Sequence, residues 1–311
     1  HTDLEDDKQT VSFPSVSTVA TFTTTGTHEQ QAGEKTIVKD IVSYKNLKVG
    51  QGYVVKGILM DKTGNAIKVN DKQITSNVEF IPEKSEGSVD VEYKFDSTSF
   101  EGKDIVVFET IYRDDKVVAS HEDLEDDKQT VSIIDISTVA VDRSTGKKEM
   151  TLGDSVELKD TVSYKNLTEG NKYSLKGFVV DKAKKEVIAE SSAEFKADKA
   201  DGSTDVIFKV NTNKVTGKEL VVYEELYDGD GNLIASHKDI DDKDQTVSVP
   251  TPPTTPPTTP PVTPPETPQP PMVKTGDIIA WASLAGVILV FIGGFAIVNS
   301  LRKKKKDKVE K

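Results

Sequence analysis

The chain of 311 residues contains no cysteine. This absence excludes disulfide bonds, so any covalent staple in the protein must be of another kind. Aromatic residues make up only 6% of the chain, and most of them fall in strand-like segments that read as core. Their scarcity disfavours a broad aromatic patch for binding a ligand. Histidine occurs only four times, which makes the histidine positions informative.

Positive charge is scarce outside the C-terminal tail. The whole chain has a formal net charge of −12. Residues 1–271 hold 32 Lys and Arg against 49 Asp and Glu, a net charge of −17. Such an acidic surface argues against nucleic acid as a partner.

Three of the four histidines begin the same phrase, His-x-Asp-x-x-Asp-x-x-Gln. It reads HTDLEDDKQTVS from His1, HEDLEDDKQTVS from His121 and HKDIDDKDQTVS from His237. The fixed spacing brings a base, two carboxylates and an amide together once per repeat. We interpret the phrase as the equipment of a reaction in which the glutamine takes part.

The chain is built from long repeats. The glutamines of the phrase, Gln9, Gln129 and Gln245, are 120 and 116 residues apart. VSYKNL also recurs, as do STVA and the pair VVFE and VVYE. We expect residues 1–12 to be the last strand of an upstream repeat, and 13–132 and 133–249 to be two complete domains. Because the chain begins within a repeat, we expect it to be the C-terminal piece of a longer protein.

Each complete repeat predicts a β-sandwich. Short runs rich in Val, Ile, Thr, Tyr and Phe are separated by turns that contain Gly, Asn or Asp. Residues 88–95, SVDVEYKF, alternate as a half-buried strand should, whereas 105–108, IVVF, are continuously apolar as a central strand should be. We therefore expect an all-β protein with tandem immunoglobulin-like β-sandwich domains.

The C-terminal part of the chain changes character twice. Residues 250–277 begin with a Pro/Thr-rich linker, which favours an extended conformation. Residues 278–301 carry no charge and are long enough for one transmembrane helix. Residues 302–311 contain seven Lys and Arg, which predicts a basic cytoplasmic tail.

The combination of STVA, VVFE and HxDxxDxxQT resembles the VaFE repeats, or intramolecular ester-bond domains, of Gram-positive surface adhesins. In that family a Thr of the first strand attacks the side-chain amide of a Gln on the last strand, ammonia leaves, and a Thr–Gln ester remains. The resemblance implies the bonds Thr18–Gln129 and Thr138–Gln245. It implies ten site residues, five in each repeat: Thr18, Glu109, His121, Asp126 and Gln129, then Thr138, Glu224, His237, Asp242 and Gln245.

The residue types suit this chemistry. A threonine hydroxyl is a weak nucleophile and needs a base, which is most often histidine near neutral pH. Glu109 ends a continuously apolar strand, so burial should raise its pKa and let it donate a hydrogen bond to the oxyanion. The working carboxylate is either Asp123 or Asp126, and either Asp239 or Asp242 in the second repeat. The family pattern favours the second residue of each pair.

A short motif before the apolar span resembles a Gram-positive sortase signal of the LPxTG type. It consists of Met272, Val273, Lys274, Thr275 and Gly276, with Met in place of Leu and Val in place of Pro. The resemblance implies two partners, a sortase that cleaves after Thr275 and the peptidoglycan that Thr275 then joins. The alternative is an uncleaved anchor in the membrane.

We therefore expect the extracellular structural stalk of a cell-wall-anchored adhesin, stiffened by esters that each form once, without cofactor and without turnover. The alternative is a ligand-binding adhesin or pilin module with Lys–Asn isopeptide bonds or no crosslinks. The predicted first strands, Val16–Phe22 and Ile136–Val141, contain no lysine, which disfavours isopeptide bonds. An enzyme acting on other substrates ranks last. The sequence leaves the distal host or surface ligand open.

Two further residues and one segment could also bear on function, but we assign them no part in the ester chemistry. Thr161 is a rival nucleophile, but its counterpart in the first repeat is Ile41. His28 lies outside the phrase, and we expect it at the surface. Residues 228–232 resemble the first half of a calcium loop but lack its later carboxylate, so we expect a hairpin turn and assign no metal site.

Overall fold

The computed structural model describes residues 11–252, which form an all-β protein, as the sequence predicts. The closing phrase at 1–9, the sorting motif at 272–276 and the expected membrane helix at 278–301 lie outside the described residues. No helix within 11–252 is long and apolar enough to cross a bilayer. The immunoglobulin-like assignment stays a prediction.

The strands are short and follow one another with brief turns. Their bounds are β1 Ser15–Phe22, β2 Glu29–Gln31, β3 Thr36–Lys45, β4 Tyr53–Asp61, β5 Lys68–Val69, β6 Lys72–Gln73, β7 Thr75–Phe80, β8 Gly87–Phe95, β9 Lys103–Arg113, β10 Lys116–His121, β11 Thr130–Asp142, β12 Val156–Lys165, β13 Lys172–Asp181, β14 Glu186–Lys196, β15 Gly202–Val210, β16 Glu219–Tyr227, β17 Leu233–His237 and β18 Thr246–Ser248. Two 3₁₀ turns, Thr98–Phe100 and Thr212–Lys214, precede β9 and β16.

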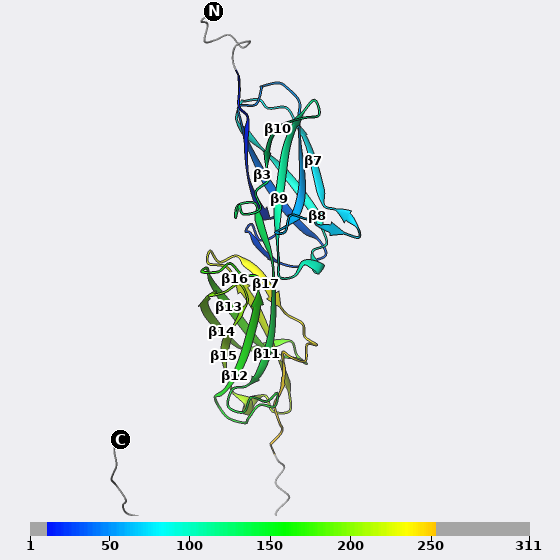
Figure 1. Cartoon of the computed structure of the whole chain (residues 1–311). Helices are drawn as coiled ribbons and strands as arrows, with labels where there is room; N and C mark the ends of the chain where they lie inside the picture. Colours follow the sequence, from blue (N-terminus) through cyan, green and yellow to red (C-terminus); the bar gives the residue numbers. More distant parts are fainter. Residues whose placement is uncertain (1–10, 253–311) are drawn as a thin grey trace, which may run out of the picture. The chain divides into compact units, whose positions relative to one another are not determined.

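Each repeat packs two sheets around its own core (Figure 1). In the first repeat the sheet β1-β3-β8 faces the strands β11-β9-β4-β7, with β10 beside β9. In the second repeat β11, β12 and β15 face β14-β13-β16-β17, with β18 beside β16. Alternation along the strands explains the packing, because β1 buries Thr18, Ala20 and Phe22 while the residues between them are more exposed.

Strand β11 belongs to both repeats. Its first residues pair with β9 of the first repeat, and residues 135–142 pair with β12 of the second. The two cores divide within it, because Ile133 packs in the first core and Ile134 in the second. One uninterrupted strand is therefore the last strand of one repeat and the first strand of the next.

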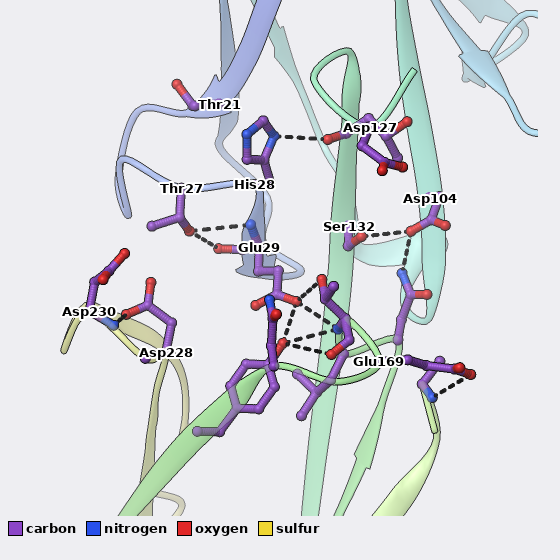
Figure 2. A pocket seen from close by; sticks show the side chains of 18 of the residues that line it. Thr21, Thr27, His28, Glu29, Asp104, Asp127, Ser132, Glu169, Asp228 and Asp230 are labelled. Carbon is purple, nitrogen blue, oxygen red and sulfur yellow. Dashed lines mark hydrogen bonds between the residues drawn. The ribbon is translucent and has the colours of Figure 1, made fainter. Parts of the chain in front are cut away.

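A carboxylate joins the two repeats beside β11 (Figure 2). Strand β2 of the first repeat pairs in parallel with β11 and carries Glu29, whose side chain is buried. Glu29 Oε1 accepts hydrogen bonds from Thr168 N at 2.8 Å, Thr168 Oγ1 at 2.6 Å and Tyr173 Oη at 2.7 Å. Charge-assisted bonds of this kind are stronger than neutral ones, so Glu29 holds the β12–β13 turn in place.

The same region corrects one expectation. His28, expected at the surface, is partly buried beside Glu29, and its Nδ1 lies 3.0 Å from Thr130 O (Figure 2). Asp228 and Asp230 line a pocket together with His28 and Glu29. Asp228 Oδ1 accepts hydrogen bonds from Asp230 N and Asn232 N, so its carboxylate closes the turn between β16 and β17. Among residues 11–252, no group of three His, Asp or Glu side chains is arranged to hold a metal ion.

Removal of the Glu29 carboxylate should weaken the protein. Glu29→Ala leaves the hydroxyl groups of Thr168 and Tyr173 without their acceptor in a buried region, and we expect it to lower the free energy of unfolding by about 1–3 kcal/mol. Urea unfolding measures this change. The matched control is Glu149→Ala at the equivalent, exposed position of the second repeat, which should leave stability nearly unchanged. Equal effects of the two substitutions would contradict the role of Glu29.

Candidate functional site

The first and last strands of the first repeat bring the predicted Thr and Gln to one place. Thr18 lies on β1 and Gln129 immediately before β11, and both side chains are buried, at 2% and 0% exposure. Ala20 N donates a hydrogen bond to Lys128 O at 2.8 Å, which places the backbone of β1 directly beside the residue before Gln129. The segments that carry the predicted nucleophile and the predicted amide are therefore neighbours.

The side-chain amide of Gln129 is held by its nitrogen. Nε2 donates hydrogen bonds to Val107 O at 2.6 Å and to His121 O at 3.3 Å. The backbone is fixed as well, because Val107 N donates to Gln129 O at 2.9 Å. In contrast, the amide oxygen Oε1 is buried and makes no hydrogen bond within the described residues. The amide is thus oriented, with its carbonyl oxygen left open to a donor.

The second repeat reproduces this arrangement. Thr138 and Gln245 have the same exposures of 2% and 0%, and Ala140 N donates to Asp244 O at 2.9 Å. Gln245 Nε2 donates to His237 O at 3.3 Å. The Oε1 atom of Gln245 and the Oγ1 atom of Thr138 are buried and unpaired within residues 11–252. Two copies of one geometry indicate that the arrangement is specified by the shared residues.

The histidine of each repeat contacts one particular aspartate. His121 Nε2 lies 3.1 Å from Asp126 Oδ2, and His237 Nε2 lies 2.9 Å from Asp242 Oδ2. Asp123 instead accepts a hydrogen bond from Glu125 N in its own loop, and Asp239 accepts one from Asp241 N. The sequence left two candidate aspartates open in each repeat. In both repeats the second candidate, Asp126 or Asp242, is the one that contacts the histidine ring.

The glutamates lie deep between the sheets. Glu109 on β9 pairs across the ladder with His121 on β10 and with Gly57 on β4, and its side chain is fully buried. A Cβ atom at Gly57 would come within 2.5 Å of both Glu109 oxygens. Gly177 has the same relation to Glu224 in the second repeat, at 2.4 Å from Oε1. Glycine is required at these two positions because a side chain there would displace the glutamate.

Sequence reasoning missed a second buried carboxyl in each repeat. Asp40 on β3 pairs with Ala20 on β1, so its side chain lies on the same face as Thr18. Asp160 on β12 has the same relation to Thr138. Both aspartates are fully buried, and neither carboxyl makes a hydrogen bond of normal geometry within the described residues. An aspartate between two inward-facing valines, as in Val38-x-Asp40-x-Val42, is the signal that points to this position.

Burial changes the proton affinity of these groups. It raises the pKa of Asp40 to about 7, although the Thr18 hydroxyl and Glu109 act in the opposite direction. It raises the pKa of Glu109 to about 8, against a hydrogen bond from Tyr93, and the charge of Asp40 raises it further. Like charges in one buried space disfavour double ionisation. Of the two groups, Asp40 is therefore the one that ionises first and Glu109 the one that keeps its proton.

The second repeat separates the two carboxyls more widely. Burial raises the pKa of Asp160 to about 6 and that of Glu224 to about 10. The charge of Lys148 acts on Asp160 in the opposite direction and favours its ionised form. The arrangement thus offers a hydroxyl beside a carboxylate, an oriented amide, and a neutral carboxylic acid. This is the equipment for acyl transfer from the amide to the hydroxyl.

The fold and the site define a class of all-β repeat protein. Each repeat of such a protein contains its own buried cluster of a Thr, a Gln and two carboxyl groups. Residues 14–133 and again 134–249 match the family of T-Q ester bond containing domains. The two matches cover well over half of the chain, and the chain belongs to this family. Its defining bond lies within the domain, so the family is not one of enzymes that turn over a separate substrate.

Solved structures that resemble the chain share little of its sequence. An adhesin from Mobiluncus mulieris that contains intramolecular disulfide, isopeptide and ester bond cross-links is 14% identical over 68% of this chain and 80% of that chain, with a TM-score of 0.35. The C-terminal domain of the AgI/II polypeptide BspA from Streptococcus agalactiae is 10% identical over 76% and 100%, with a TM-score of 0.32. A putative β-galactosidase from Bacteroides fragilis is 9% identical over 68% and 33%, with a TM-score of 0.27. No curated protein matches the chain significantly.

The raised pKa values predict how the stability of the protein depends on pH when no bond can form. In the variant Thr18→Ala, Thr138→Ala, the folded state keeps protons on the buried carboxyls that the unfolded chain releases. The contribution of these groups to the free energy of unfolding should therefore be largest below about pH 4. It should fall as the pH rises toward about 10, the highest of the raised pKa values. Urea midpoints between pH 4 and 9 measure this slope.

The control adds four neutral substitutions to that variant, namely Asp40→Asn, Glu109→Gln, Asp160→Asn and Glu224→Gln. These changes remove the titrating groups at nearly constant shape, so the slope between pH 4 and 8 should flatten. An equally steep slope in the control would show that other groups produce the dependence.

Proposed function

We propose that each repeat forms an internal ester, joining Thr18 to Gln129 in the first repeat and Thr138 to Gln245 in the second, with loss of one ammonia per bond. The observation that carries this proposal is the set of buried polar atoms that have no hydrogen-bond partner among residues 11–252: in both repeats the Thr Oγ1, the Gln Oε1 and both Asp oxygens. Buried polar groups are normally satisfied by hydrogen bonds because an unpaired one is costly. These atoms are an exception to that rule, and we explain the exception by their reaction with one another.

The geometry assigns a role to each carboxyl. Asp40, which lies on the same face as Thr18 and whose pKa the Thr18 hydroxyl lowers, takes the hydroxyl proton, and Oγ1 then bonds to Cδ of Gln129. Glu109 in its neutral form donates a hydrogen bond to the oxyanion that develops at Oε1. When the tetrahedral centre collapses, the C–N bond breaks and the nitrogen leaves as ammonia after it takes one proton from the histidine. The proton that Thr18 gave to Asp40 then replaces the one that the histidine lost. Asp160 and Glu224 have these roles in the second repeat.

The histidine acts on the side of the leaving group. The residue types predicted His121 as the base for the threonine, but Asp40 is the ionisable group whose pKa responds to the Thr18 hydroxyl. The backbone carbonyl of His121 accepts a hydrogen bond from the amide nitrogen of Gln129, and Asp126 orients its ring. We therefore assign His121 and His237 to proton delivery toward the departing nitrogen. The fold holds the Thr hydroxyl and the Gln amide next to each other, and this proximity accelerates the reaction.

The bond would connect the first strand of each repeat to the residue that immediately precedes its last strand. It closes a loop of more than a hundred residues, which stabilises the folded state by about 5 kcal/mol in a chain-entropy treatment. Tension that enters through β1 would pass along the ester into β11 without unzipping the sheets. This supports the role of a structural stalk in a surface adhesin.

The anchoring of such a stalk is a proposal from sequence. The Pro/Thr-rich segment, the motif at 272–276, the apolar span at 278–301 and the basic tail together support attachment to peptidoglycan by a sortase. We place the repeats outside the cell, with the distal host or surface ligand left unassigned. The reaction would occur once per repeat, so the protein would modify itself and would not act as an enzyme on other molecules.

Intact mass spectrometry tests the proposed bonds. The chain should be lighter than its sequence by two ammonia molecules, and Thr18→Ala and Thr138→Ala should each restore one. Thr161→Ala is the control, because the Thr161 hydroxyl lies on the other face of β12 and bonds to Asp205 Oδ1 at 2.7 Å. It should not change the deficit. Hydroxylamine should reopen the bonds, since it cleaves esters and leaves amide crosslinks intact. A mass equal to that of the sequence would overturn the proposal.

A further inference from the structure

The two repeats differ at one side chain that touches the buried glutamate. In the first repeat Tyr93 on β8 donates a hydrogen bond from Oη to Glu109 Oε1. The equivalent position on β15 of the second repeat is Phe208, which has no hydroxyl group. The Thr, Gln, Asp, Glu and His of the two sites are otherwise the same residue types.

The rings of Tyr93 and Phe208 occupy the same place. A Cβ atom at Gly57 would meet Tyr93 Oη at 1.7 Å, and a Cβ atom at Gly177 would meet Phe208 Cζ at 2.3 Å. Both rings are fully buried, at 1% exposure. The hydroxyl group is therefore the relevant difference between the two rings. It lies beside Gly57 of β4 and contacts the glutamate.

The hydroxyl group changes which oxygens of the glutamate are free. Glu109 Oε1 is occupied by Tyr93, and only Oε2 is left unpaired among the described residues. In the second repeat both oxygens of Glu224 are unpaired within the described region. A hydrogen bond donated to a carboxylate favours its ionised form. Tyr93 thus confines the acidic proton of Glu109 to Oε2 and also makes that proton easier to lose.

The charged neighbours of the two glutamates differ at one position of their own strands, because Glu225, whose charge raises the pKa of Glu224, corresponds to Thr110 in the first repeat. Glu109 faces Asp40 from β3, His121 from β10 and Tyr93 from β8, while β4 contributes only Gly57. Glu224 faces Asp160 from β12 and His237 from β17, with Glu225 adjacent on its own strand. One further difference lies near the aspartate, where Lys148 acts on Asp160 and the equivalent residue of the first repeat is His28.

We propose that Tyr93 is a positioning residue that restricts ester formation in the first repeat to a narrow range of pH, whereas the second repeat, with Phe208, reacts over a wide range. This inference rests on the proposed ester chemistry. The reactive state needs an ionised aspartate and a neutral glutamate, so its population depends on the separation of their pKa values. In the first repeat these are about 7 and about 8, and in the second about 6 and about 10.

The test follows each repeat separately within the whole chain. Thr138→Ala leaves only the first repeat able to react, and Thr18→Ala leaves only the second. Each variant is isolated in denaturant before it has folded and is then refolded by dilution at pH 7.5 and pH 9. The loss of ammonia is followed by intact mass. Circular dichroism at both pH values reports refolding, so that a slow reaction is distinguished from slow folding.

We expect the first repeat to react about sixfold more slowly at pH 9 than at pH 7.5, because the acid is then mostly ionised. The second repeat should change by less than about twofold. Tyr93→Phe should make the reaction rate of the first repeat as insensitive to pH as that of the second. Phe208→Tyr should make the reaction rate of the second repeat fall steeply between pH 7.5 and pH 9. The reciprocal pair keeps the proposal testable if one variant fails to fold.

The outcomes separate this inference from the proposed function. Equal pH profiles in the two repeats, unchanged by either substitution, would overturn the role of Tyr93 and leave the ester bonds intact. Absence of ammonia loss from both repeats at every pH would instead overturn the proposed function.

Discussion

The structure depends on the burial of two carboxyl groups side by side in an otherwise apolar core. Asp40 and Glu109 lie between the sheets of the first repeat, and Asp160 and Glu224 lie between those of the second. Water cannot stabilise their charges there, and two charges in one space repel each other, so each pair is driven toward one ionised and one neutral member. A base and an acid are the two functions that acyl transfer requires, and here both follow from burial of the same functional group.

The register of the strands turns this electrostatic arrangement into a site. Ala20 is paired with Asp40, which places the aspartate on the face of Thr18, and Gly57 is paired with Glu109, which makes room for the acid. The backbone bond from Ala20 to Lys128 brings the first strand beside the residue that precedes Gln129. A shift of one residue in any of these pairs would move a site residue to the opposite face of its sheet. The fold therefore prepares the reactants before any chemistry begins.

Strand β11 gives these local arrangements a consequence along the chain. It starts next to Gln129 and carries Thr138, so the proposed acceptor of the first bond and the proposed nucleophile of the second lie on one continuous stretch. Glu29 ties the turn after β12 to the first repeat beside the first residues of that strand. Tension that leaves the first ester would enter the strand that carries the second. The proposed crosslinks would then form a chain of covalent supports in series.

Much of this organisation is visible in the sequence. Alternating and continuous apolar runs predict the strands, and the repeated phrase from His121 to Gln129 predicts which polar residues belong together. Asp40 carries a sequence signal, because it lies between the inward-facing Val38 and Val42, but only strand pairing shows that it shares a face with Thr18. Tyr93 reads as a core aromatic, and its contact with Glu109 depends on how two strands of different sheets, β8 and β9, face each other. Glu29 lies in a three-residue strand, too short to give a period.

The account is tested most directly by mapping the covalent structure of the native chain. The protein is digested in denaturant at mildly acidic pH, and the peptides are sequenced by tandem mass spectrometry. Two branched peptides are predicted, one joining Thr18 to Gln129 and one joining Thr138 to Gln245, each lighter by one ammonia than its two linear parts. Recovery of these four residues in ordinary linear peptides, or of a branch that begins at a lysine, would contradict the central claim.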